Sequence, residues 1–310
     1  MTIKEFKFSA IRELKGEGRI CSLSPELDVE VFLSYFLNLN KTQLLLSQNQ
    51  EIPQEKISLL NEALEKRKKG LPVAYITNHK EFYGYDFYVT PDVLIPKPDT
   101  EILVEHALNL IAEKIESKKN SILTICDMCT GSGCIALSVI KNLIEKFHIP
   151  QEIFPKFILA DISLKALEIA KINAANLLKD QSKLIHSKVS FIQTNLFDAI
   201  PYKFDMILTN PPYIPHSMVN ELLLDGRNEP RLALDGDVTI TGEKADCNDG
   251  LEIIRNLIPQ IKEHLSPLGT VLMETGEYNA TEAAGIAERY NFKTKIHKDF
   301  EGQLRVVEMN

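Results

Sequence analysis

The stretch Ile122-Leu123-Thr124-Ile125-Cys126-Asp127-Met128-Cys129-Thr130-Gly131-Ser132-Gly133-Cys134 decides the fold. Its first five residues are apolar enough to predict a short buried strand, and a helical pattern follows from Gly133 to about Lys146. Gly131 and Gly133 carry no Cβ, so the backbone between strand and helix can turn sharply and approach a ligand closely. The start of the helix presents free N–H groups. The stretch therefore predicts a strand, a ligand-binding turn and a helix in succession.

The alternation of strands and helices continues to the end of the chain. Further strands are predicted at residues 157–160, 189–193, 206–208, 270–273, 293–297 and 305–308, and further helices at 164–178, 251–265 and 280–290. Such alternation implies a mainly parallel, doubly wound sheet, and ligands on such sheets bind at the carboxyl ends of the strands. We expect an α/β, Rossmann-like fold.

The chain before this region has a different pattern. Apolar residues up to about Lys69 recur at helical spacing, whereas residues 82–89 are β-formers interrupted by Gly84 and bounded by Pro91. Asp99 or Thr100 can cap a helix that runs to about residue 111. We expect a helical domain at residues 1–80, a β-hairpin linker at 81–98 and the α/β domain at 99–310.

Bulk composition excludes several classes of function. The 310 residues carry a formal net charge of −8, which does not suit tight contact with phosphate backbones. The basic run Lys66-Arg67-Lys68-Lys69 is interpreted as the solvated end of a helix, with contact to RNA or an acidic partner left open. The sequence has no long apolar stretch and no signal pattern, so we expect a cytoplasmic protein with no membrane contact and no nucleic-acid partner.

The five cysteines predict reduced thiols, because their number is odd and no secretion signal is present. Cys126-x-x-Cys129, with Cys134 nearby, has the spacing of a redox or metal pair. The pair straddles the end of a predicted buried strand, where cysteine behaves as a small hydrophobe. No second ligand pair follows at zinc-like spacing, so we expect no metal.

Asp161, at the end of the second strand, strengthens the interpretation of the glycine turn. Its carboxylate can accept hydrogen bonds from both hydroxyls of a ribose, so turn and aspartate together predict a site for an adenosine-containing ligand. Gly131-x-Gly133-x-x-Ala136 also fits the loose dinucleotide fingerprint. S-adenosylmethionine, NAD and a purely structural turn stay open at this point.

The segment Asn210-Pro211-Pro212-Tyr213 directly follows an apolar strand and indicates the chemistry. An amide nitrogen is a poor nucleophile because its lone pair is delocalised, and two acceptors around its NH2 group can re-aim that lone pair. The Asn210 side-chain oxygen is one acceptor and a backbone carbonyl is the second. The prolines stiffen the segment, and Tyr213 offers a flat face for stacking. The segment predicts methylation of an amide or amine nitrogen, with the sulfonium of S-adenosylmethionine as donor.

Motifs from about Gly70 onward resemble the HemK/PrmC family of protein-(glutamine-N5) methyltransferases, which act on class-1 peptide-chain release factors. They are Leu71-Pro72-Val73-Ala74-Tyr75-Ile76, Glu81-Phe82-Tyr83-Gly84, Val93-Leu94-Ile95-Pro96-Lys97-Pro98-Asp99-Thr100-Glu101, the turn at residues 127–133, Asn210-Pro211-Pro212-Tyr213, and Glu229-Pro230-Arg231-Leu232-Ala233-Leu234. The proline segment around Pro96 is the most specific of them. The resemblance implies a class I methyltransferase sheet of seven strands and a helical N-terminal domain that recognises the substrate. It also implies a monomer whose substrate is the glutamine of the release factor's Gly-Gly-Gln loop.

The resemblance further implies roles for individual residues. S-adenosyl-L-methionine would be bound by Asp127, Cys129, Thr130, Gly131, Ser132, Gly133, Asp161, Asn195, Leu196 and Asn210. The substrate glutamine would be bound by Asn210, Pro211, Pro212 and Tyr213, of which Asn210, Pro211 and Tyr213 carry the catalysis.

The sequence departs from the family pattern in four places. Cys129 replaces a usual Gly, Asn195 a usual Asp and Lys97 a usual Arg, and residues 237–248 form an insertion expected to be a mobile surface loop near the substrate entrance. Two alternative functions stay open. One is a DNA or RNA adenine-N6 methyltransferase, and the other is a catalytically silent module that binds an adenosine ligand.

Overall fold

The structure is a computed structural model, and it describes residues 1–15, 22, 24–117 and 122–310. The chain forms two compact units. The first contains residues 1–79 and 220–228, and the second contains residues 80–219 and 229–310. The expected domain boundaries at residues 80 and 98 do not include a second segment in the helical domain. In the structure, residues 220–228 belong to the first unit as well.

The first unit is helical. Its helices are α1 (Ile3–Leu14), α2 (Pro25–Leu37), α3 (Lys41–Leu46), α4 (Gln54–Lys68) and α5 (Val73–Thr77). α1 begins at a capping box, in which the Thr2 hydroxyl accepts from the Glu5 backbone N–H at 3.2 Å and the Glu5 carboxylate accepts from the Thr2 N–H at 2.8 Å. The apolar faces of these helices meet in one core that contains Phe6, Val29 and Phe32.

The basic run at residues 66–69 ends α4, as the sequence predicts, but its charges are not simply solvated. Arg67 donates to the Asp28 carboxylate at 2.7 Å, Lys66 pairs with Glu62 at 2.8 Å, and Lys68 pairs with Glu65 at 2.6 Å. Lys66, Lys68 and Lys69 nevertheless remain exposed, as the sequence predicts, and acidic side chains of the same unit pair with three of the four charges.

The second unit begins with the hairpin β1 (His79–Phe82) and β2 (Tyr85–Tyr88), whose first residue still belongs to the first unit. The expected hairpin at residues 82–89 therefore exists. Gly84, at φ +77°, lies in the turn between its two strands. A 3-10 turn, η1 (Pro98–Thr100), then leads into α6 (Glu101–Ser117), which is longer than the sequence predicts.

Within the described residues, the sheet of the second unit has seven strands in the order β5-β4-β3-β6-β7-β9-β8. These strands are β3 (Thr124–Met128), β4 (Lys156–Asp161), β5 (Val189–Gln193), β6 (Phe204–Thr209), β7 (Leu265–Glu274), β8 (Thr294–Lys298) and β9 (Leu304–Met309). β3 to β7 pair in parallel, and β9 is antiparallel to both β7 and β8. The sheet confirms the expected class I methyltransferase fold.

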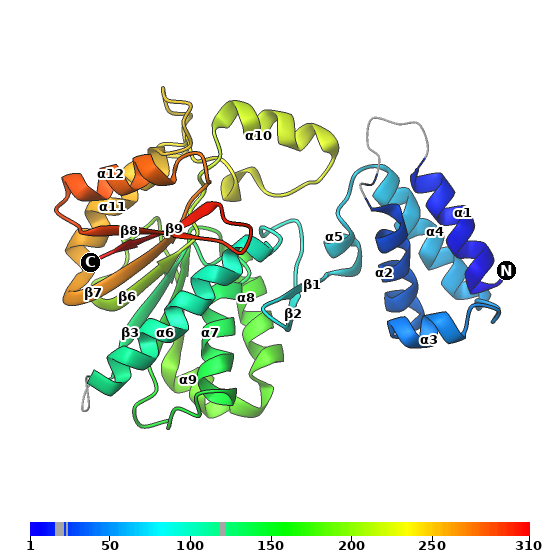
Figure 1. Ribbon diagram of the computed structural model, residues 1–310, viewed down its shortest axis with the longest axis horizontal. Coiled ribbons are helices and arrows are strands. Elements are labelled where there is room, and N and C mark those ends of the chain that lie inside the picture. Colours follow the sequence, from blue (N-terminus) through cyan, green and yellow to red (C-terminus); the bar gives the residue numbers. More distant parts are fainter. Residues whose placement is uncertain (16–21, 23, 118–121) are drawn as a thin grey trace. The chain divides into compact units, whose positions relative to one another are not determined.

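Two layers of helices cover the sheet (Figure 1). α6, α7 (Cys134–Glu145) and α8 (Leu164–Leu177) pack in sequence on one face. α11 (Glu252–His264) and α12 (Ala280–Arg289) pack on the other face, over a core that includes Cys126, Met128 and Val271. The shorter α9 (Ser182–Lys188) and α10 (His216–Leu222) complete the helices of the described chain. None of the helices in the described ranges is both long and apolar enough to cross a membrane.

The strand order fixes where a ligand can bind. The chain moves outward from β3 to β4 and β5, and then returns to place β6 on the other side of β3. Loops that leave neighbouring strands in opposite directions open a crevice at their carboxyl ends. The register aligns Met128 with Ala160 and with Thr209, so the turn after β3, Asp161 on β4 and Asn210 after β6 all reach the same edge of the sheet.

Candidate active site

The turn between β3 and α7 depends on its two glycines. Gly131 has φ +55° and Gly133 has φ +79°, in the left-handed region that disfavours residues with a Cβ. A Cβ on Gly131 would face open space, whereas one on Gly133 would lie 2.9 Å from a Leu137 side-chain carbon. Gly131 therefore exposes backbone toward the crevice, and Gly133 allows the close packing of α7 behind it.

Asp127 supports this turn from beneath. Its side chain is fully buried, and its Oδ2 accepts from the Thr130 hydroxyl at 2.7 Å and from the Ala136 N–H at 3.2 Å. Its Oδ1 is buried and has no hydrogen-bond partner among the described residues. Burial raises the pKa of Asp127 to about 7 against the lowering effect of these two donors. This geometry fits an organiser of the turn better than a direct ligand contact.

Asp161 closes the next strand and joins the same turn. Its Oδ2 accepts from the Gly131 N–H at 2.9 Å, and its Oδ1 accepts from the Ser163 N–H at 2.9 Å. Burial raises the pKa of Asp161, whereas these backbone donors lower it. Each carboxylate oxygen keeps a second lone pair, so both can also accept from a pair of ribose hydroxyls.

Two residues without glycine's freedom adopt positive φ at this edge. Cys129 has φ +60° and Leu196 has φ +47°. A non-glycine residue in this region carries about 1–3 kcal/mol of strain, and such strain concentrates at functional sites. Cys129 stands where the family usually has Gly, and its backbone adopts the left-handed conformation that a glycine would adopt more easily. The cysteines of the described chain, Cys126, Cys129, Cys134 and Cys247, are free thiols, and Cys21 lies outside the described residues.

A cavity at the carboxyl edge brings the separate segments together. Its lining includes Cys129, Thr130, Gly131, Ser132, Asp161, Asn195, Leu196, Asn210 and Pro212. Four other predicted residues, Asp127, Gly133, Pro211 and Tyr213, are not among the described residues that line it. Asp127 and Gly133 support the turn from behind, and Pro211 is buried.

Tyr213 points away from the cavity into a buried polar network. Its hydroxyl donates to Glu274 Oε1 at 3.1 Å, and Glu274 is 1% exposed. Thr100, at the start of α6, also hydrogen-bonds Glu274 and accepts from Asn210 Nδ2 at 3.4 Å. The Glu274 carboxyl group therefore connects both ends of the segment 210–213, directly at Tyr213 and through Thr100 at Asn210. Burial raises the pKa of Glu274 to about 7, and its Oε2 has no hydrogen-bond partner among the described residues.

The network also fixes the orientation of the Asn210 amide. Because the Nδ2 end faces Thr100, the Oδ1 end is left to accept a hydrogen bond in the cavity. The backbone carbonyl of Tyr213 is already engaged, since it accepts from Asn279 Nδ2 at 3.0 Å and from the Tyr278 hydroxyl at 3.3 Å. A second acceptor for a substrate amide must then come from an earlier carbonyl of the segment.

The sequence gives no role to several residues that prove to line the cavity. Segment 92–100 contributes Asp92, Val93, Leu94, Pro96, Lys97 and Thr100, and the stretch after residue 229 contributes Pro230, Leu232, Ala233, Asp235, Val238, Thr239, Ile240 and Gly242. Lys97 forms an ion pair with the buried Glu229 at 2.7 Å, which joins these two stretches. Residues 93–101 and 229–234 belong to motifs of the family resemblance, so part of each stretch carries a sequence signal. The lining residues from Asp235 to Gly242 lie outside those motifs, and spacing alone does not show which side chains face a ligand.

The chain is similar to known proteins along most of its length. The family model described as PrmC N-terminal domain matches residues 9–77, and the one described as methyltransferase small domain matches residues 102–245. A release factor glutamine methyltransferase from Koribacter versatilis is 35% identical over 312 residues, which cover 99% of this chain and 98% of the relative. The chain belongs to the release factor glutamine methyltransferase family.

Other members of the release factor glutamine methyltransferase family agree with this placement. The enzyme of that name from Clostridium acetobutylicum is 34% identical, with 90% of this chain and 89% of the relative covered. Among solved structures, a protein-(glutamine-N5) methyltransferase (release factor-specific) from Alicyclobacillus acidocaldarius is 23% identical, with a TM-score of 0.37 and coverage of 72% of this chain and 98% of that one. The two relatives from Koribacter versatilis and Clostridium acetobutylicum confirm the family expected from the motifs.

Proposed function

We propose that this chain transfers the methyl group of S-adenosyl-L-methionine to the side-chain amide N5 of a glutamine, the one in the Gly-Gly-Gln loop of class-1 release factors. One observation carries the proposal. Asn210 and Pro212 line the same cavity as the turn at 129–132 and Asp161, so an amide acceptor and an adenosine-type site share one space. Membership in a family whose relatives are named for this activity supports the same substrate.

The residues present fit the cofactor. Gly131 has a left-handed backbone with open space where a Cβ would stand, and Asp161 keeps free lone pairs beside it. Cys129 to Ser132 would hold the methionine end, Asp161 the ribose, and Asn195 with Leu196 the adenine. When bound, the cofactor supplies an electrophilic methyl group on a sulfonium.

The chain's own residues would prepare the nucleophile. Asn210 Oδ1 and an earlier carbonyl of the segment would accept from the two hydrogens of the glutamine NH2 group, which turns the nitrogen lone pair out of conjugation. The amide nitrogen then forms one bond to carbon as the carbon–sulfur bond breaks, and it releases one proton. Because that proton becomes acidic only after alkylation, water can take it and no side-chain base is required.

The proposal is tested with labelled S-adenosylmethionine and purified release factors. Label should enter the wild-type factor but not a factor whose Gly-Gly-Gln glutamine is changed to alanine. Asn210→Ala should lose about 100-fold or more in turnover because it removes a positioned acceptor at the reacting centre. Asn109→Ala, on the exposed face of α6, is the matched control and should keep full turnover.

Three outcomes would overturn the assignment. Label that still enters the glutamine-to-alanine factor would exclude the proposed target atom. Label that enters DNA or RNA in place of the factor would favour the adenine-N6 alternative. Calorimetry that shows cofactor binding without any transfer would favour the silent binding module.

A further inference from the structure

Residues 238–244 form a hairpin within the insertion at residues 237–248. Val238 and Lys244 pair in an antiparallel bridge. The Thr239 N–H donates to the Glu243 carbonyl at 2.7 Å, and the Gly242 N–H returns to the Thr239 carbonyl at 2.9 Å. Gly242, at φ +86°, allows the tight reversal. The insertion is therefore built as a compact element, called here the 238–244 hairpin.

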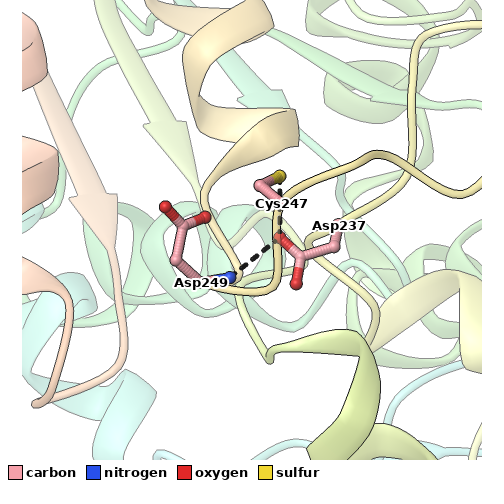
Figure 2. Close-up of side chains that lie close together, drawn as sticks. All are labelled: Asp237, Cys247 and Asp249. Atoms are coloured by element: carbon pink, nitrogen blue, oxygen red, sulfur yellow. Dashed lines mark hydrogen bonds between the residues drawn. The ribbon is translucent and has the colours of Figure 1, made fainter.

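A buried carboxylate anchors the base of the 238–244 hairpin. Asp237 is fully buried, and its Oδ1 accepts from the Gly250 N–H at 2.8 Å, the Asp249 N–H at 3.3 Å and the Cys247 thiol at 3.3 Å (Figure 2). Its Oδ2 accepts from the His216 N–H at 3.0 Å. Four donors thus bind one carboxylate, which joins both ends of the insertion to the methyltransferase unit.

The side chains of Asp237, Cys247 and Asp249 lie close enough together to resemble a metal site, but their hydrogen bonds and ion pairs indicate a structural anchor. One ligand atom from each of Asp237, Cys247 and Asp249 lies within 4.8 Å of the others. However, the oxygens of Asp237 are already occupied by N–H and S–H donors, and Asp249 is paired with Arg255. Burial raises the pKa of Cys247 to about 11, so its thiol keeps the proton that it donates.

The anchored hairpin forms one wall of the active-site cavity. Val238, Thr239, Ile240 and Gly242 line the cavity together with the turn after β3 and Asp161. Across the cavity edge, Asn195 Nδ2 donates to the Ile240 carbonyl at 2.8 Å. An asparagine amide has one donor end and one acceptor end. The bond to Ile240 therefore leaves the Asn195 oxygen, and only that atom of the amide, to accept from a ligand.

We propose that the 238–244 hairpin is a retaining wall for the nucleoside end of the cofactor, held closed by the hydrogen bond between Asn195 and Ile240. The inference rests on the proposed S-adenosylmethionine site. Ile240 is 39% exposed, and its side chain supplies apolar surface that a planar base can cover. The bond to Asn195 couples the wall to the residue that would contact the base. The wall acts mainly on dissociation, because a bound nucleoside must pass it to leave.

Asn195→Asp is the sharpest perturbation. A carboxylate cannot donate, and the substitution sets two oxygens against each other at a 2.8 Å contact, so the hairpin should open. The dissociation rate of S-adenosylhomocysteine, measured by stopped flow with the full chain, should rise about three- to tenfold, the range expected for loss of one neutral hydrogen bond. Glu243→Gln, an exposed side chain on the same hairpin, is the matched control and should leave the rate unchanged.

A double-variant cycle separates the wall from a direct effect of Asn195 on the ligand. A second variant replaces residues 239–243 with two glycines and should release S-adenosylhomocysteine at least as fast as Asn195→Asp. In that shortened background, Asn195→Asp should add no more than about twofold, because the Ile240 carbonyl is absent. Thermal melting must show that both variants remain folded.

The outcomes are distinguishable. A shortened variant that releases S-adenosylhomocysteine at the wild-type rate would overturn the wall while leaving methyl transfer intact. Equal effects of Asn195→Asp in both backgrounds would overturn the coupling through Ile240. A wild-type chain that binds no S-adenosylhomocysteine would overturn the proposed function together with this inference.

Discussion

Thr100→Val tests whether the buried network behind the active site positions Asn210. Valine has nearly the shape of threonine but offers no acceptor to Asn210 Nδ2 and no hydrogen bond to Glu274. The Asn210 contact is long at 3.4 Å, so its own contribution is at the low end, about 0.5–1 kcal/mol. Leaving the buried Glu274 without its second donor adds about 1 kcal/mol. Loss of about 1.5–2 kcal/mol of positioning corresponds to a fall in kcat of roughly 10- to 30-fold.

The assay separates positioning from binding and from folding. Steady-state methylation of a release factor should show the fall in kcat, whereas calorimetry should give an unchanged Kd for S-adenosylmethionine. Thr100→Ser restores the hydroxyl and should recover most of the turnover. Full activity in Thr100→Val would refute the reasoning, and so would a loss that Thr100→Ser shares.

Three other changes follow from the structure. Burial raises the pKa of Glu274 to about 7 from its ordinary value of 4.5, so the folded chain binds the carboxyl proton more tightly than the unfolded chain does. The stabilisation from this bound proton is fully present below about pH 4.5. It declines by about 3 kcal/mol as the pH rises through 7. In urea titrations, the free energy of unfolding of Glu274→Gln should therefore rise relative to that of the wild type between about pH 5 and about pH 8. A difference between the two free energies that stays constant over this pH range would contradict the prediction. Gly131→Ala meets open space but must hold φ +55°, which costs about 1–2 kcal/mol and should weaken S-adenosylmethionine binding about 5- to 30-fold in calorimetry. Its control, Gly285→Ala inside α12, also meets open space and should raise the melting temperature slightly without changing that affinity. Gly70→Ala would bring its Cβ to 2.0 Å from the Asp225 carbonyl oxygen at φ +96°, so the free energy of unfolding should fall by about 2–4 kcal/mol; an unchanged denaturation midpoint would contradict the close approach.

Hydrophobic patterning located all seven strands of the sheet in the described residues, although several of their bounds differ. β5 (Val189–Gln193) begins and ends where the sequence predicts, because its apolar run is bounded by polar residues on both sides. β7 (Leu265–Glu274) is much longer than the predicted 270–273, since its first residues, Leu265-Ser266-Pro267-Leu268-Gly269, carry no strand pattern and are placed by their neighbours. α9 and α10 were not predicted, because short helices leave too little periodicity to detect.

The site was predicted unevenly for a similar reason. The glycine turn, an aspartate at a strand end and an asparagine before two prolines carry local sequence signals. Seven expected residues of these three segments line the cavity, together with Asn195 and Leu196. Glu274 carries no such signal, since a lone glutamate at the end of an apolar strand is indistinguishable from a solvated one until β6 and β7 are paired. The direction of Tyr213 likewise depends on that partner, so its predicted stacking role stays a prediction.

The return of residues 220–228 to the helical unit has a consequence for biosynthesis. A ribosome releases the helices of residues 1–79 long before it makes this second segment, a delay of roughly seven to thirty seconds at about 5–20 residues per second. During that interval Gly70 lacks the backbone that packs against it in the finished protein. The amino-terminal helices thus reach their final packing only after most of the sheet has been translated, which gives the nascent chain a waiting period in which chaperones can act on it.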